Sequence, residues 1–421
     1  MKPNQYPNLT GKHILIIVEN LPVPFDRRVW QEATTLREAG AEVSIICPIM
    51  KGYTARFEQI DGIDIYRHPL ATEASGAMGY LAEYGSAMFW WYRLSIQIYR
   101  RKPFHVIHGC NPPDLIFTVA LPFKAFGVKY VFDHHDINPE LYIAKYGRKD
   151  MLYRLMLLLE RWTFQTADFS IATNDSYREI AMRRGGMPAD KVVVVRSGPK
   201  LERLKLGPGD EQYKKGRRYL VGYLGVIGEQ EGIDLLLAAV KMIVARRQDV
   251  QFAIVGGGTS LAKMELLAVE LGVSDYVDFY GRVSDEMLVN VLNTADVCVN
   301  PDSPTEMNNL STMNKIMEYM ALTKPIVQFD LKEGRVSAQR ASLYAAPDNI
   351  ADFAEKIAWL LDHENERRSM GEFGYQRVLT ELSWTHERGK LLELYDRVLA
   401  SFAKQPIVSR QPLNNPLSLA E

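Results

Sequence analysis

The chain has 421 residues, 47% hydrophobic and 24% charged, which excludes a long disordered chain, a collagen-like fibre and a disulfide-rich mini-protein. At about 150 residues per domain, this length predicts two to three domains. The three cysteines, Cys47, Cys110 and Cys298, lie far apart and lack C-x-x-C spacing. We therefore expect neither a zinc knuckle nor a disulfide framework, and a reducing cytoplasm fits.

The net charge of −1 argues against a general nucleic-acid binder. Residues 1–200 carry 25 Lys and Arg against 20 Asp and Glu, whereas residues 201–421 carry 25 against 31. A basic N-terminal half suits an anionic partner such as the inner face of the cytoplasmic membrane, but ordinary variation in surface charge explains it equally well. We expect a cytoplasmic protein, with peripheral contact at that membrane face as an open option.

The start of the chain shows no secretory signal pattern. The most apolar stretch, residues 78–99, is interrupted by Glu83 and Arg93 and falls short of a membrane span. Apolar residues occur all round the predicted helix near Phe89 and Tyr92, which favours burial over docking at a membrane surface.

Short apolar runs rich in β-branched residues alternate with helical patterns through the first half of the chain. The first helix is predicted at 27–39 and stops at Gly40. This alternation indicates a parallel sheet covered by helices on both faces. The predicted strands are residues 13–19, 42–48, 106–109, 128–136, 168–173 and 192–196.

The alternation of strands and helices stops at residue 197 and restarts at residue 219. Residues 197–217 combine Pro, Gly and charge with little apolar periodicity, which is typical of an interdomain linker. Helices are then expected over most of 350–402, before a polar, Pro-rich tail that we expect to be frayed. Further strands are predicted at 219–225, 251–258, 276–281, 296–301 and 324–329.

We therefore predict an α/β fold with two Rossmann-like, doubly wound domains facing a central cleft. Ligands of such sheets bind at the carboxyl ends of the strands. The expected divisions are an N-terminal acceptor-side domain at 1–198, a linker at 199–217, a nucleotide-sugar-binding domain at 218–385, and at 386–421 a C-terminal helix packing back on the N-terminal domain plus the tail.

The polar segment 300–327 carries the most informative pattern. A helix is predicted to begin near Ser311, and free backbone N–H groups at a helix N-terminus form an anion site. Lys315 would lie about one turn in, with Glu318 on the same face. The amides and Lys315 suit a diphosphate, and Glu318 suits ribose hydroxyls. From spacing alone, a capped surface helix with a Lys–Glu ion pair is the simpler explanation.

A family resemblance strengthens the functional interpretation. The segment KIMEYMALTKPIV resembles the signature of the family 4 retaining glycosyltransferases of the GT-B fold. Residues 22–48, VFDHHDINPE, VGGG and FYGRVSDEML resemble further motifs of that family, and the likeness extends over residues 12–400. Such chains belong most often to bacterial polysaccharide or lipid-linked oligosaccharide pathways.

The resemblance implies a hexosyltransferase that moves a sugar from a nucleotide-sugar, expected to be a UDP-sugar, to a hydroxyl of a glycan or lipid-linked acceptor. The expected chemistry is front-face: the leaving diphosphate helps to deprotonate the acceptor. No cofactor is implied, since the nucleotide-sugar is a substrate. No metal is expected either, because the sequence has no D-x-D motif and strand alternation keeps the four side chains of DHHD, 133–136, from converging.

Carried over to this sequence, Glu318 matches the second glutamate of the family's E-x7-E motif, which binds the ribose. Leu310 stands at the first glutamate, so Asn308, Asn309 or Ser311 would take over that role. Val226 and Glu231 stand where the family has an Arg and a Lys that contact the diphosphate. Lys315 and backbone amides must then do more in the transition state. His135 matches the histidine of the active-site loop that approaches the donor sugar.

Weaker candidates have simpler alternatives. Tight turns explain the glycines, an N-cap and surface arginines explain the residues after the first strand, and a strand-end turn explains His135. The donor-side candidates are Gly225, Gly228, Gly256, Gly257, Gly258 and Thr312, and the acceptor-side candidates are Asp26, Arg27, Arg28, Asp136 and Glu140.

Two rival functions stay open. A non-catalytic GT-B subunit that partners an active transferase is supported by the missing Arg, Lys and first Glu. A sugar-nucleotide epimerase or a phosphorylase on the same fold is the other; for an epimerase, no acid/base pair stands out in the sequence.

Overall fold

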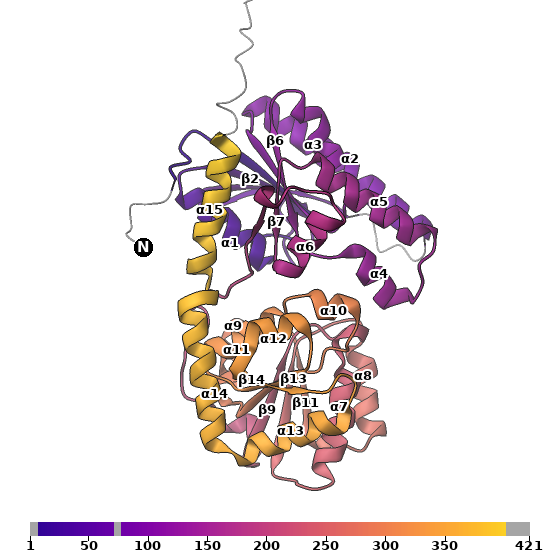
Figure 1. The fold of residues 1–421 in the computed structure, drawn as a ribbon, viewed down its shortest axis with the longest axis vertical. Helices are drawn as coiled ribbons and strands as arrows, with labels where there is room; N and C mark the ends of the chain where they lie inside the picture. The colour runs from indigo at the N-terminus through magenta and orange to yellow at the C-terminus, as the bar shows by residue number, and fades with distance from the viewer. Residues whose placement is uncertain (1–6, 71–76, 401–421) are drawn as a thin grey trace, which may run out of the picture.

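Two α/β units are stacked along the long axis of the molecule (Figure 1). The computed structural model describes residues 7–70 and 77–400, apart from the side chains of 77–84; the expected frayed tail lies outside this part. The strand orders are β3-β4-β2-β1-β5-β6-β7-β8 in the first unit and β11-β10-β9-β12-β13-β14 in the second. These two doubly wound sheets confirm the predicted α/β class.

The first sheet contains every strand predicted in this half, and two more. The additional strands, β3 and β4, lie at its edge. There FEQI alternates between exposed and half-buried residues, and so lacks the continuous apolar run of a central strand. β3 pairs antiparallel with β4, so the expectation of a wholly parallel sheet was wrong at this edge. The strands are β1 (His13–Val18), β2 (Glu42–Pro48), β3 (Phe57–Ile60), β4 (Ile63–His68), β5 (Val106–Cys110), β6 (Lys129–His134), β7 (Phe169–Ala172) and β8 (Val192–Val194).

Helices cover both faces of this sheet. The α1 helix begins after Asp26, whose carboxylate accepts a hydrogen bond from the Val29 amide at 3.1 Å. In α2, Trp91 is fully buried but Phe89 is more than half exposed, so this helix is buried on one side only, and its exposed side also carries apolar residues. The helices are α1 (Arg27–Glu38), α2 (Ala77–Arg101), α3 (Ile116–Lys124), α4 (Asn138–Tyr146), α5 (Met151–Thr166) and α6 (Asp175–Arg183).

The second unit is built around a smaller sheet. Its last strand, β14, has two half-buried residues among its four and was missed by the sequence analysis. The strands are β9 (Tyr219–Leu224), β10 (Val250–Val255), β11 (Val277–Gly281), β12 (Val297–Asn300), β13 (Ile326–Phe329) and β14 (Ser342–Ala345). The helices are α7 (Ile233–Val244), α8 (Leu261–Glu270), α9 (Asp285–Thr294), α10 (Glu306–Leu310), α11 (Asn314–Ala321), α12 (Lys332–Ala338), α13 (Ile350–Asp362) and α14 (Glu364–Arg377).

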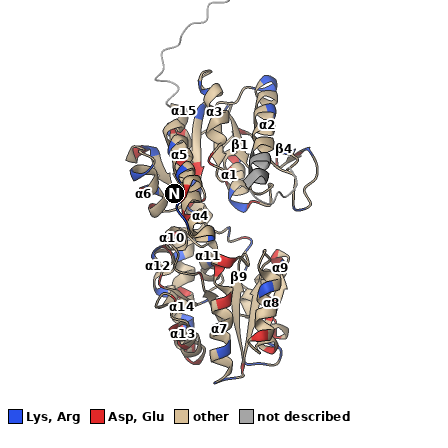
Figure 2. Ribbon diagram, turned by 90° about the vertical axis from the view of Figure 1, so that its right-hand side faces the viewer, with Lys and Arg blue, Asp and Glu red and all other residues tan. Residues whose placement is uncertain are grey.

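The single helix predicted to begin near Ser311 is two helices. The short α10 ends at Leu310, Ser311 has extended backbone angles, and α11 begins at Asn314. Lys315 is therefore the second residue of α11, not a residue one turn in. In Figure 2, α10 and α11 lie where the two units meet, and α10 packs against α4 of the first unit.

The chain crosses between the units twice. After α14 and a π-helical turn it continues as α15 (Trp384–Ala400), which joins the core of the first unit through Leu391 and Val398. The indole of Trp384 donates to Thr35 Oγ1 at 3.0 Å, and its backbone amide donates to the Pro199 carbonyl at 3.2 Å. The two crossing segments thus lie side by side. Within the described residues, no helix is long and apolar enough to cross a membrane.

Candidate active site

His135 follows β6 directly, at the end of the first sheet that faces the second unit. Its backbone amide donates to Asn111 Oδ1 at 2.7 Å, and its Nε2 is hydrogen-bonded to the Asp133 carboxylate. The ring is therefore oriented from two sides rather than held by backbone contacts alone.

Asp133 is in turn held by Arg28, which lies in the first turn of α1. The Arg28 guanidinium is buried and lies 2.8 Å from Asp133 Oδ1 and 3.0 Å from Glu32 Oε1. It also donates to the Val195 carbonyl and to Ser197 Oγ, each at 3.0 Å. The alternative of a surface arginine is wrong for Arg28. One buried cation thereby joins the His135 loop to the segment that leads into the second unit.

Protonation keeps this cluster close to neutral. Burial opposes the charge on Asp133, but Arg28 and His135 outweigh burial and hold its pKa well below the usual value. For Glu32, burial dominates and the neighbouring Asp133 adds to it, so its pKa lies well above the usual value. Asp133 is therefore the readily ionised carboxyl opposite Arg28, while burial and Asp133 make Glu32 harder to ionise than an exposed glutamate.

His134 points to the other face of β6. It is fully buried and packs against the rings of Phe132, Phe164 and Tyr177, at centroid distances of 5.0–5.4 Å. Alternation along the strand therefore keeps the four DHHD side chains from converging on one point, as expected, although Asp133 and His135 on one face do meet.

Asp133 and three neighbouring side chains could together act as metal ligands. Candidate ligand atoms of Glu32, Cys110, Asp133 and His135 lie within 4.8 Å of one another. The positive charge of Arg28 already occupies this cluster, and burial raises the pKa of Cys110 well above its usual value. Metals bind the thiolate and the carboxylate, so an ion here would have to displace protons that burial favours and lie beside the Arg28 charge.

Lys315 is buried in the second unit among acidic and phenolic groups. Its Nζ donates to Asp302 Oδ1 at 3.0 Å, to Glu231 Oε2 at 3.2 Å and to the Tyr223 hydroxyl at 3.4 Å. Burial disfavours the charge, but Asp302, Tyr223 and Glu231 raise the pKa of Lys315 well above the usual value. The surface Lys–Glu pair considered from the sequence is therefore wrong, because Lys315 is buried and bound to other partners.

Glu318 faces the first unit instead. Its carboxylate is ion-paired with Arg203 and lies 3.5 Å from Arg27 Nη1. Both arginines also reach Asp285, at 2.6 Å from Arg27 and 3.3 Å from Arg203. A pocket of about 280 Å³ lies here between α1, the 197–203 segment and α11. Arg27 was expected on the acceptor side. Arg203 was not among the predicted site residues, because only the fold brings a residue so distant in the chain to Glu318.

The glycine loops of the second unit pack on each other. Gly256 has φ +142°, and a Cβ there would lie 1.7 Å from the Gly225 carbonyl oxygen. Gly256 is thus required by the contact between the loops that follow β9 and β10, whatever ligand approaches them. Gly228 and Gly257 lie in the same two loops.

The polar residues proposed to replace the first glutamate are engaged in local structure. Asn308 Nδ2 donates to the Gln230 carbonyl at 3.0 Å, and Asn309 Oδ1 accepts from the Lys332 amide at 2.8 Å. Ser311 Oγ bonds to the Met307 carbonyl at 2.7 Å, and Thr312 Oγ1 accepts from Asn174 at 3.1 Å. Each of these side chains is thus held by at least one contact within the protein.

The acceptor-side candidates Asp26, Glu140 and Asp136 also have partners within the first unit. Asp26 caps α1, as its simpler alternative predicted. Glu140 is buried and ion-paired with Arg184, so it stabilises the first unit. Burial raises the pKa of Asp136, whose backbone amide donates to Asn111 at 3.2 Å beside His135.

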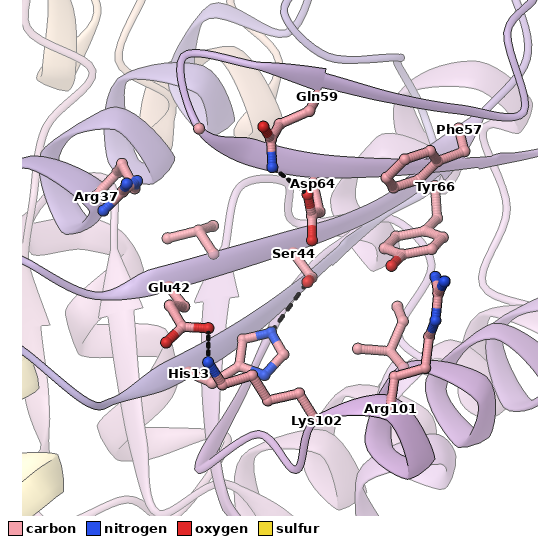
Figure 3. Close-up of a pocket in the computed structure, with 13 residues that line it drawn as sticks. His13, Arg37, Glu42, Ser44, Phe57, Gln59, Asp64, Tyr66, Arg101 and Lys102 are labelled. Carbon is pink, nitrogen blue, oxygen red and sulfur yellow. Dashed lines mark hydrogen bonds and ion pairs between the residues drawn. The ribbon is translucent and has the colours of Figure 1, made fainter.

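A larger pocket, of about 450 Å³, lies at the opposite end of the first sheet (Figure 3). It is lined by residues at the starts of β1 and β2 and by residues of β3 and β4, and several of its polar groups pair with one another. Lys102 pairs with Glu42, and His13 Nε2 lies 3.0 Å from Ser44 Oγ. None of the candidate residues lines this pocket. The candidate residues of the first unit lie at the other end of the strands.

The sequence matches known families over both units. Residues 26–198 match the glycosyl transferase 4-like domain, and residues 218–363 match glycosyl transferases group 1. This chain belongs to the family 4-type glycosyltransferases. It is an enzyme of the glycosyltransferase class with a GT-B fold, as the resemblance implied.

The relatives are distant. The 2-deoxystreptamine glucosyltransferase of Streptomyces kanamyceticus is 24% identical over 72% of this chain and 80% of its own length. The matched parts span between 41% and 80% of the curated relatives. Sucrose-phosphate synthase from Thermosynechococcus elongatus shares the fold, with a TM-score of 0.76 and 19% identity over 93% of this chain and all of that one. Anabaena HepE with UDP-glucose has a TM-score of 0.66 and 13% identity, over 93% and 100%.

The burial of His134 predicts a pH-dependent stability. Burial and the charge of Arg184 lower its pKa from 6.5 to about 3. As the pH falls below about 6.5, the unfolded chain gains a proton that the folded protein excludes, so the free energy of unfolding falls by up to about 1.4 kcal/mol per pH unit. His134→Asn should therefore lose less stability than the wild type between pH 7 and pH 5, measured by urea denaturation.

The matched control is His363→Asn, because His363 is exposed. It should show the wild-type loss over the same interval. A wild-type loss in His134→Asn would contradict the assignment.

Proposed function

We propose that this glycosyltransferase retains anomeric configuration and moves a sugar from a UDP-sugar to a hydroxyl of a glycan or lipid-linked acceptor. The observation that carries the proposal is the start of α11. Lys315 and Glu318 lie there within one turn of each other, and no described side chain caps the helix N-terminus. The backbone amides of an N-terminus without a side-chain cap, a buried ammonium and a carboxylate complement a diphosphate and a ribose. HepE, which shares the fold, binds UDP-glucose.

Cations from outside the second unit take part in this proposal. Val226 and Glu231 supply no positive charge, and Glu231 is bound to Lys315. Arg27 and Arg203 already converge on Glu318, so both lie beside the proposed ribose position. When the ribose hydroxyls occupy Glu318, these guanidinium groups become available to the diphosphate. The charge that develops on the leaving group is then met by Lys315, Arg27 and Arg203.

His135 acts from the other side of the proposed site. Its Nε2 is engaged by Asp133 and by the Arg28 guanidinium, whose Nε lies 3.0 Å away, which leaves Nδ1 as the ring nitrogen available to a hydroxyl. A leaving diphosphate on the same face as the acceptor removes the acceptor proton, so no further protein base is required. The proposal differs from a non-catalytic subunit, an epimerase or a phosphorylase in one measurable result: the purified chain transfers sugar from UDP-sugar to an alcohol acceptor.

Replacing Glu318 tests the nucleotide site. A hydrogen bond to a charged group contributes about 1.5–3 kcal/mol, so Glu318→Ala should weaken UDP binding roughly ten- to a hundredfold in calorimetry. Glu306→Ala, an exposed carboxylate on α10, is the matched control and should bind UDP normally. Unchanged UDP affinity in a folded Glu318→Ala protein would overturn the ribose assignment.

Replacing His135 separates catalysis from binding. His135→Ala should bind UDP as the wild type does, because the proposed nucleotide contacts do not include His135, but should transfer sugar about a hundredfold more slowly or worse. His134→Ala is unsuitable as the mild control first expected from strand alternation, because His134 is a core residue. His134→Asn, compared at equal folded concentration, replaces it. Transfer at the wild-type rate by His135→Ala would leave His135 as a structural turn residue.

We also propose that transfer needs no metal ion. The one cluster of potential ligands found among the described residues lies against the Arg28 guanidinium, and burial raises the pKa of its Glu32 and Cys110. Initial rates should therefore be the same with and without EDTA. Inactivation by EDTA that Mn²⁺ reverses would refute the proposal.

A further inference from the structure

The α5 helix exposes an apolar stripe to solvent. Met151, Leu155, Leu158 and Trp162 are spaced four, three and four residues apart, which places them along one face of the helix. Met151 is 85% exposed and Trp162 is 44% exposed. The opposite face, with Glu160, Thr163 and Phe164, is buried against the unit. The chain thus leaves uncovered a row of large side chains that a globular protein normally covers.

Positive charge lies along one side of this stripe and before its first residue, where Asp150 pairs with one of the cations, Arg148, at 3.5 Å. Arg154 and Arg161 are exposed along one side of it, and Lys145, Arg148 and Lys149 are exposed in the segment that leads into α5. Glu160 is the only acidic residue in α5, and it is buried and paired with Arg184. The exposed side of the helix therefore presents apolar and cationic groups together.

We propose that α5 and residues 145–149 form a docking face that binds the surface of an anionic phospholipid bilayer. A helix of this length, about 24 Å, with an apolar stripe flanked by arginines, matches one that lies in the plane of the interface. Leucine, methionine and tryptophan side chains would enter the acyl boundary, and the arginines and lysines would contact lipid phosphates.

The position of the face suits the proposed function, on which this part of the inference rests. The chain runs from His135 into α4, which is about 14 Å long, and then directly into the basic segment and α5. α4 also packs against α10 of the second unit. A bilayer on this face would lie beside the cleft, where a lipid-linked acceptor could reach His135 without leaving the membrane.

Vesicle co-sedimentation tests the docking face without any sugar transfer. The full-length protein should sediment with phosphatidylglycerol–phosphatidylcholine vesicles and much less with phosphatidylcholine alone, and rising salt should release it. L155E/L158E should abolish sedimentation. The matched control is L266E/V269E on α8, whose side chains are 65% and 64% exposed, and it should bind like the wild type.

A second variant leaves the apolar stripe intact. R154Q/R161Q should weaken binding to the anionic vesicles by about fivefold per arginine, or roughly 30-fold together. Because Cys47, Cys110 and Cys298 are buried, a polarity-sensitive dye on L158C reports this face selectively, and its emission should shift to the blue on vesicles. The same dye on L266C should not shift.

Three results would overturn the proposal: equal sedimentation of folded L155E/L158E and wild type, no blue shift at L158C, or a lipid-free dimer that L155E/L158E dissociates, which would make the stripe a contact between two copies. Transfer to a soluble acceptor is measured in parallel. If the wild-type protein binds vesicles but transfers no sugar to the soluble acceptor, the proposed function is refuted and the docking face is not.

Discussion

The buried guanidinium of Arg28 joins the His135 loop to the segment that leads into the second unit. Its five donors reach the carboxylates of Asp133 and Glu32, the Val195 carbonyl and the Ser197 hydroxyl, on segments that are far apart in the chain. A buried cation without these partners would cost several kcal/mol, so the partners and Arg28 fix one another's positions. The orientation of His135 and the start of the crossing between the units therefore depend on the same ion pair.

Much of the fold could be predicted from the sequence because its central strands are apolar on both faces. Runs such as HILIIV and VQFAIV are buried along their whole length, which leaves an unbroken hydrophobic signal. The missed strands β3 and β14 lie at sheet edges, where one side faces solvent and polar residues enter the run. The break between α10 and α11 was also missed, since nothing in STMNK is a strong helix breaker.

The candidate site was less predictable, because its partners are set by tertiary contacts. A motif indicated Glu318 and Lys315, but their partners lie in distant segments: Arg203 is 115 positions from Glu318, and Tyr223 is 92 positions from Lys315. Arg28 resembled an ordinary charge at the start of a helix until the fold buried it. The exposed stripe of α5 could have been found, because a four-three-four spacing of apolar residues with arginines between them is visible in the sequence.

The departures from the family motif share one physical explanation. Two carboxylates lie beside Lys315: Glu231, which stands in place of the expected cation, and Asp302. The second unit is thus less positive around the proposed diphosphate position, while Arg27 of the first unit and Arg203 of the connecting segment approach Glu318. Positive charge that the second unit lacks is supplied across the junction. A diphosphate bound there would attract both arginines toward α11, so donor binding would draw the units together and bring His135 toward the sugar at the same step.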